Sequence, residues 1–184
     1  MRKVKKFKLT SEFIVDISGV KLFRIKALIE FGNVKAGDLG GYIEKEENLS
    51  HMGDAWVSDD ARISGNAQVF GNAQVFGDAQ VFGDAWVFGN ARVSGNARVS
   101  GDAQVFGDAR VSGDKDYAYA HGFGSCNRTT TFFRLKDGDV GVRCGCFYGT
   151  LAQFRDKVCE THGETKKAQE YLMLADLMEI RFKN

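Results

Sequence analysis

Proline is absent from this 184-residue chain, whereas glycine occurs 22 times. Globular enzymes usually place both residues in loops, so glycine without proline indicates a periodic use of glycine. No stretch approaches the roughly 20 apolar residues of a membrane-spanning helix, and no apolar run of signal-peptide length follows the basic start MRKVKKFKLTSEF. Excess charge is also lacking, since 25 Lys and Arg oppose 24 Asp and Glu. These absences argue against membrane and nucleic-acid partners, and four cysteines without a secretory signal predict reduced thiols in a cytoplasm.

Charge is nevertheless distributed unevenly along the chain. Residues 1–26 contain eight basic and two acidic groups, and residues 27–60 contain two basic and eight acidic groups. Neighbouring blocks of opposite sign are expected to neutralise each other within the fold. The alternative is a solvated basic arm that binds an acidic partner.

A six-residue repeat occupies the middle of the chain. From Gly53 to Ser112, ten consecutive units follow one another without an insertion, starting with GDAWVS and ending with GDARVS. Each unit has Ala in its third place and Val or Ile in its fifth, so both side chains point to one face of an extended segment. Asn or Asp fills the second place and Gly the first, except at Asp59, which gives a turn signal every six residues.

Such short strands cannot pair well as a meander of hairpins. They fit a coil of three strands in which each strand stacks on the one eighteen residues later, around a narrow interior of Ala and Val. This arrangement is a parallel β-helix, one of the folds that a hexapeptide period indicates. A disordered glycine-rich linker does not fit, because alternating Ala and Val have no place in a solvated linker.

The repeat resembles the hexapeptide-repeat superfamily, whose members form left-handed β-helices. The flanking stretches are similar to those of short phage and prophage hexapeptide-repeat proteins, a group largely of unknown function; they are NVKAGDLGGYIEKEENLSHMGDAWV, NRTTTFF, CGCFYGTLAQF and ETHG. The resemblance implies a first coil that begins before Gly53, with Ile43 and Leu49 in register with the inward alanine column. It also implies a dimer or trimer, the cytoplasm of a host cell, and a host protein as partner, as in counter-defence proteins.

The predicted fold is therefore mainly β with three parts. Residues 1–37 form a β cap over one end of the coil, residues 38–114 form the β-helix, and residues 115–184 form a β-hairpin and two helices. Residues 115–128 are expected to be an irregular loop, followed by a hairpin in which Val140, Val142, Cys144 and Cys146 share one face. Thr150 and Gly163 are expected to cap the first helix, and the second runs from about Thr165 to Phe182.

Counting three units per coil places the units that begin at residues 65, 83 and 101 on one wall. Phe70, Phe88 and Phe106 would then stack about 4.8 Å apart, with Trp86 beside them. An aromatic strip in water is unusual, so this wall should be covered either by the flanking segments or by another subunit. The predicted interface comprises Phe70, Phe76, Phe82, Trp86, Phe88 and Phe106.

Four other patterns suggest chemistry less strongly. His51 or His121 would be the general base if the chain were an acyltransferase like some members of the superfamily, but neither has an evident partner. Cys144, Cys146, Cys159 and His162 have ligand types suited to zinc, although buried structural cysteines explain them better. The loop with Ser125, Asn127, Arg128 and Thr129 would bind an anion or a small nucleotide through Arg128 and backbone amides. The Asn and Asp corners are expected to form hydrogen-bonded ladders rather than calcium sites.

The sequence thus predicts a non-catalytic protein that needs no cofactor or metal. It would act by self-association and by binding another macromolecule, with an acyltransferase-like enzyme and an anion-binding protein as the alternatives.

Overall fold

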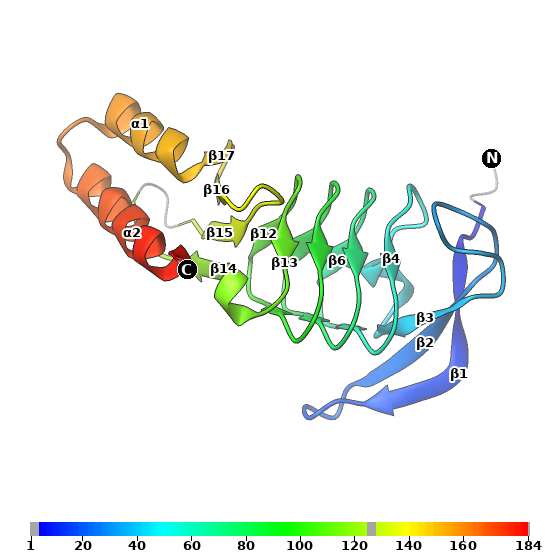
Figure 1. Cartoon of the computed structure of the whole chain (residues 1–184). Helices are drawn as coiled ribbons and strands as arrows, with labels where there is room; N and C mark the ends of the chain where they lie inside the picture. Colours follow the sequence, from blue (N-terminus) through cyan, green and yellow to red (C-terminus); the bar gives the residue numbers. More distant parts are fainter. Residues whose placement is uncertain (1–3, 125–127, 184) are drawn as a thin grey trace.

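The computed structural model describes residues 4–124 and 128–183. An antiparallel hairpin lies at one end, a β-solenoid forms the middle, and a second antiparallel sheet with two helices lies at the other end (Figure 1).

The solenoid consists of two-residue parallel strands arranged in three walls. Each strand pairs with the one eighteen residues later, as Trp86–Val87 does with Gln68–Val69, which confirms the predicted coil. The first wall contains β4 (Trp56–Val57), β7 (Gln74–Val75), β10 (Arg92–Val93) and β13 (Arg110–Val111). The second contains β5 (Arg62–Ile63), β8 (Gln80–Val81) and β11 (Arg98–Val99), and the third contains β6 (Gln68–Val69), β9 (Trp86–Val87) and β12 (Gln104–Val105). The left-handed sense of the coil stays a prediction from the family resemblance.

The composition of the repeat follows from the tight packing of successive coils. Every inward Ala and Val of the array is fully buried. At the corners the backbone turns with positive φ; Gly89, for example, has φ +68°, and a Cβ there would lie 2.9 Å from the backbone nitrogen of Gly107. The outward-pointing Asn and Asp side chains of the corners form the predicted ladder, in which Asn66 donates to Asp84 at 3.0 Å. Glycine is therefore required both by the turn and by the next coil.

The N-terminal segment seals one end of the solenoid. Strand β1 (Phe7–Val15) pairs antiparallel with β2 (Lys21–Ala27), and β2 pairs with β3 (Leu39–Ile43). Strand β3 then pairs parallel with β5, so the second wall extends into a six-stranded sheet. Phe7 and Ile25 are fully buried in the same core as the array. The hairpin therefore buries apolar surface that the first coil would otherwise expose.

The register of the first coil differs from the prediction by two residues. Ile43 and Leu49 are buried, but they pair with Ile63 and Val69 of the Val column, and not with the alanine column. Leu49 is followed by a corner that is two residues longer than the corners of the array, and this corner contains His51 and Met52. The insertion moves the upstream residues out of the expected register. A short 3₁₀ turn, η1 (Glu46–Asn48), precedes it.

The amides of each coil donate to the carbonyls of the next coil, as Trp56 does to Ala73. The two ends of the solenoid therefore leave different backbone groups without a partner coil. At the N-terminal end these are carbonyls, and buried side-chain donors reach them. The Lys6 Nζ donates to the carbonyls of Gly53 at 3.2 Å and Ala55 at 2.7 Å, and the Asn48 amide donates to those of Gly65 at 3.1 Å and Ala67 at 2.8 Å. At the C-terminal end the free groups are amides, which Thr131 and Asp114 accept from Gln104 and Arg98. Each cap therefore supplies the side-chain chemistry that its end needs.

The buried Lys6 predicts a specific pH dependence of stability. Burial lowers its pKa from 10.5 to about 8 in the folded protein. Between these values the unfolded chain binds a proton that the folded chain has lost, so rising pH favours the folded state. From pH 8 to 10.5, we expect the free energy of unfolding of the wild type to rise relative to that of Lys6→Met, by up to about 1.4 kcal/mol per pH unit. Urea titrations of both proteins across this range would measure it, and a constant difference would contradict it.

The C-terminal part is a four-stranded antiparallel sheet covered by two helices. Its elements are η2 (Asp114–Asp116), β14 (Tyr117–Ala120), β15 (Thr130–Arg134), β16 (Val140–Cys144), β17 (Phe147–Thr150), α1 (Leu151–His162) and α2 (Lys166–Phe182). Neighbouring residues of β15 point to opposite sides: Phe133 is buried in the solenoid core, and Phe132 is buried against the helices. The sheet thus closes the C-terminal end of the solenoid and carries the helices on its other face (Figure 1).

Two expectations for this part require correction. The expected loop at residues 115–128 contains strand β14, in which Tyr117 pairs with Phe133. The expected run of four residues on one strand face ends at Cys144, because the chain turns at Gly145 and Cys146 into β17. Cys146 is therefore exposed in a turn. The helix caps are as predicted: Thr150 accepts from the Gln153 amide at 3.3 Å, and α1 ends at Gly163.

Candidate binding surface

A column of three aromatic rings runs along the third wall of the solenoid. Phe70 and Phe88 stack with ring centroids 4.8 Å apart, and Phe88 and Phe106 stack at 4.6 Å, with the planes within 5° of parallel. The side chains follow β6, β9 and β12 and therefore repeat at the spacing of the coils. The sequence had placed these three residues on one wall, and the structure shows them there. We call Phe70, Phe88 and Phe106 the aromatic column.

The C-terminal end of the aromatic column is covered by the chain itself. The Phe106 ring contacts Tyr148, with centroids 4.3 Å apart, and Phe133, with centroids 6.1 Å apart. The Arg143 guanidinium lies 5.3 Å from the centroid of the same ring. Of the two covers that the sequence left open, the C-terminal sheet supplies one at this end of the wall.

The N-terminal end of the wall is open. Trp86 is 42% exposed there and packs edge-on against Phe70, with centroids 6.0 Å apart. Both side chains line a hollow of about 790 Å³, which is bounded on its other sides by Val4, Ile29, Met52 and the segment from Glu46 to His51. Met52 is 73% exposed. We call Phe70, Trp86, Val4, Ile29 and Met52 the apolar rim.

The sequence did not indicate three members of the apolar rim. Val4 and Ile29 lie outside the repeat, and Met52 lies in the two-residue corner insertion. Their sequence positions give one indication: Val4, Ile29 and Met52 are large apolar residues at positions where the repeat pattern does not require an apolar side chain.

His51 lies at the polar edge of this hollow, and its ring contacts residues that stabilise the fold. Its ring stacks on Phe7 with centroids 4.3 Å apart, and its Nδ1 accepts the Lys6 amide at 3.2 Å. Its Nε2 lies 3.8 Å from a Glu46 carboxylate oxygen. Burial lowers the pKa of His51, although Glu46 acts in the opposite direction. The second acyltransferase candidate, His121, follows β14 at the opposite end of the solenoid, so the two histidines do not form one site.

Phe76 and Phe82 lie on the other two walls. Phe76 follows β7 of the first wall, with the Arg92 guanidinium 5.4 Å from its ring centroid. Phe82 follows β8 of the second wall and has Arg98 at 5.7 Å. An arginine of the next coil thus contacts each ring, and neither ring joins the aromatic column. The part that these two residues would take in an interface stays a prediction.

The predicted anion-binding loop is only partly described. Ser125 and Asn127 lie outside the described residues. Arg128 and Thr129 line a hollow of about 390 Å³ beside the C-terminal sheet, together with Arg143 and His121.

The cysteines of the sequence pattern do not form a metal centre in the part of the chain that the structure describes. Cys144, Cys146 and Cys159 have free thiols, and no cluster of three or more His, Cys, Asp or Glu side chains suited to a metal ion is found there. The Cys144 thiol instead accepts from the Thr130 hydroxyl at 3.2 Å.

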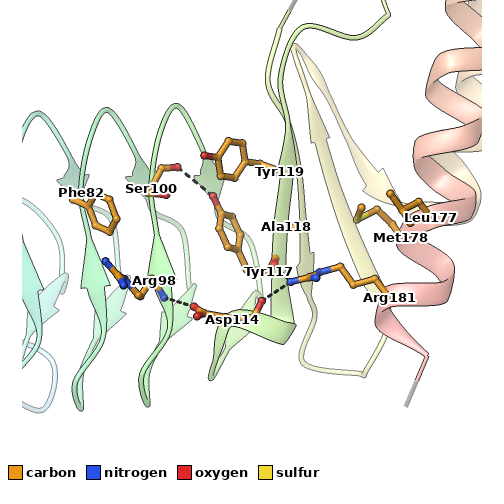
Figure 2. Close-up of a pocket in the computed structure, with 10 residues that line it drawn as sticks. All are labelled: Phe82, Arg98, Ser100, Asp114, Tyr117, Ala118, Tyr119, Leu177, Met178 and Arg181. Atoms are coloured by element: carbon orange, nitrogen blue, oxygen red, sulfur yellow. Dashed lines mark hydrogen bonds between the residues drawn. The ribbon is translucent and has the colours of Figure 1, made fainter.

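Another hollow, of about 600 Å³, lies between α2 and the second wall (Figure 2). Its polar groups connect the C-terminal part to the solenoid. Asp114 accepts the Arg98 amide at 3.1 Å, Tyr117 donates to the Ser100 carbonyl at 3.2 Å, and Arg181 donates to the Asp114 carbonyl at 2.8 Å. These groups are used by the fold, so we assign this junction a structural role.

Comparison with known families agrees with the architecture. A family model described as the YdcK beta solenoid repeat matches residues 61–77 and 91–105, which lie within the array. A comparison with curated proteins gives no match. Over residues 4–124 and 128–183, no helix has both the length and the apolar character needed to cross a membrane.

Proposed function

We propose that this protein is a non-catalytic β-solenoid that acts by association through the apolar rim and the open part of the aromatic column. It associates with a second copy of itself at this surface, as a dimer or trimer, and presents the assembled solenoid to another macromolecule. A host protein in the cytoplasm is the partner class that the resemblance to phage proteins implies.

The observation that carries this proposal is the exposed Trp86 beside a hollow that is apolar on the side of Val4, Ile29, Met52 and Phe70. Large aromatic side chains at the centre of an apolar patch contribute most to protein interfaces. Trp86 and Met52 remain exposed, whereas Phe106 at the other end of the same wall is already covered. The solenoid holds Phe70 and Trp86 of this patch on one wall, so little conformational entropy of these two side chains is lost on association.

Replacing Trp86 with glutamine tests the proposal without disturbing the repeat. Glutamine stands at the same place on the same wall at Gln68 and Gln104. The exposed part of an indole is roughly 100 Å², and burying it contributes roughly 2–3 kcal/mol. Its loss should therefore weaken self-association about 30- to 150-fold. Light scattering over a concentration series would measure this, with a dimer or trimer expected for wild type.

The control is Gln80→Asp. Gln80 has the same place in its six-residue unit as Trp86 but lies on the second wall, so this change should leave the molar mass of the oligomer unchanged. A wild-type protein that stays monomeric at all concentrations would contradict self-association. An oligomer that Trp86→Gln leaves intact would remove the apolar rim from the interface.

A further inference from the structure

Two adjoining hollows lie at the C-terminal end of the molecule, away from the apolar rim. The first, which we call the ring pocket, has a volume of about 260 Å³ and lies between β16, β17 and the two helices. The second, which we call the arginine pocket, is the hollow of about 390 Å³ beside the C-terminal sheet. Arg128 and Gly145 line both of them. The two hollows therefore meet at one guanidinium.

The ring pocket has aromatic walls. Phe154 packs edge-on against Tyr171 with centroids 5.6 Å apart, and Phe147 lies 5.6 Å from Phe154. His162 lies 5.7 Å from Tyr171 on another side. Apolar walls with a few polar groups are typical of small-molecule sites. A flat ring is the ligand shape that such walls favour.

Its charge is one-sided. Arg128 and Lys157 line the ring pocket, and none of the described residues that line it carries a carboxylate; Lys157 is ion-paired with Glu160 at 2.8 Å. Among the described residues, no hydrogen-bond or ion-pair partner of the Arg128 side chain is found. An unpaired guanidinium between two hollows is suited to bind an anionic oxygen.

The arginine pocket adds further donors beside Arg128. Arg143 is fixed there, because its Nε donates to Gln104 at 3.0 Å and its guanidinium lies over the Phe106 ring. The Thr129 hydroxyl lies 2.9 Å from the His121 Nδ1. Among the described residues that line this hollow, Asp102 is the one carboxylate. Two arginines and a hydroxyl thus face the same space.

Gly145 makes room for this arrangement. A Cβ at residue 145 would lie 3.0 Å from the Arg128 Nη1, and the glycine has φ +58°. A larger residue in this turn would displace the guanidinium from the boundary between the hollows.

We propose that the two hollows form one binding site for a phosphate monoester that carries a planar ring, the chemical class of the nucleoside monophosphates. The ring occupies the ring pocket, and the phosphate lies between Arg128 and Arg143. The site does not depend on the apolar rim, so it stands or fails separately from the proposed association.

Calorimetric titration with the four common nucleoside monophosphates tests this site, with adenosine and inorganic phosphate as partial ligands. At least one monophosphate should bind at least about tenfold more tightly than adenosine or phosphate alone, because only it contacts both hollows. Arg128→Glu should lower that affinity by at least about tenfold through loss of a charge-assisted contact. Arg62→Glu, a charge reversal on the second wall, should leave it unchanged. Thermal denaturation would verify that both variants are folded.

Thiol labelling locates the bound ligand independently. Cys146 lines the ring pocket, whereas Cys159 is exposed and does not line it. A saturating monophosphate should slow alkylation of Cys146 and leave Cys159 unaffected, as read by mass spectrometry of each peptide. The proposal is overturned if no monophosphate binds, if phosphate alone binds equally well, or if binding leaves Cys146 unprotected.

Discussion

Replacing Asn48 with alanine is expected to lower the free energy of unfolding by about 3 kcal/mol. The side chain is fully buried, and its amide nitrogen donates to the carbonyls of Gly65 and Ala67. Alanine would remove the donor from both carbonyls, at a cost of about 1–3 kcal/mol for each. Chemical denaturation monitored by circular dichroism would measure the loss.

Two further variants separate hydrogen bonding from side-chain size. Asn48→Asp keeps the shape and the oxygen that accepts the Lys45 amide, but it turns an oxygen toward the two carbonyls. We expect it to be at least as destabilising as alanine at neutral pH. Asn72→Ala, in the exposed corner ladder, should cost less than about 1 kcal/mol. Equal losses at residues 48 and 72 would show that Asn48 does not cap the solenoid.

Replacing Phe88 with serine is expected to cost about 2–4 kcal/mol of stability. Its ring lies between two stacked rings, at 4.8 Å and 4.6 Å, so the change removes both contacts and opens the centre of the column. Serine is tolerated by the backbone, since Ser94 and Ser100 occupy the same place in other units. Thermal and urea denaturation would measure the effect.

Phe76→Ser is the matched control. Phe76 has an arginine and no stacked ring above it, so we expect a loss below about 1.5 kcal/mol. Similar losses for the two variants would show that the column adds nothing beyond the burial of single rings. Because Phe88 stabilises the fold, Trp86 is the better residue for testing association.

The sequence predicted the parts of the fold that repeat. Ten identical spacings define the inward Ala and Val columns and the wall of Phe70, Phe88 and Phe106, because one geometric rule applies to every unit. Both caps of α1 were also predicted, since Thr150 and Gly163 act through local hydrogen bonds and turn geometry.

The remainder depends on single contacts between distant residues. Lys6 and Asn48 lie outside the repeat, and their partners are backbone carbonyls within it. No periodic pattern in the sequence therefore predicts these two contacts. Strand β14 was missed because Tyr117–Ala120 is short and pairs with a strand that comes later in the chain. The apolar rim required knowledge of where the N-terminal hairpin and the long corner with Met52 meet the third wall.

Solvent access to Trp86 tests the central proposal most directly. The chain has two tryptophans, so Trp56→Phe leaves Trp86 as the sole fluorescent tryptophan. Trp56 is 7% exposed and contacts Phe31, so phenylalanine keeps an aromatic ring at this buried position. Acrylamide quenching of this variant should weaken severalfold as concentration rises and the oligomer forms, because the indole becomes buried in the interface. Quenching that remains unchanged between dilute monomer and assembled protein would show that association, if it occurs, uses another surface.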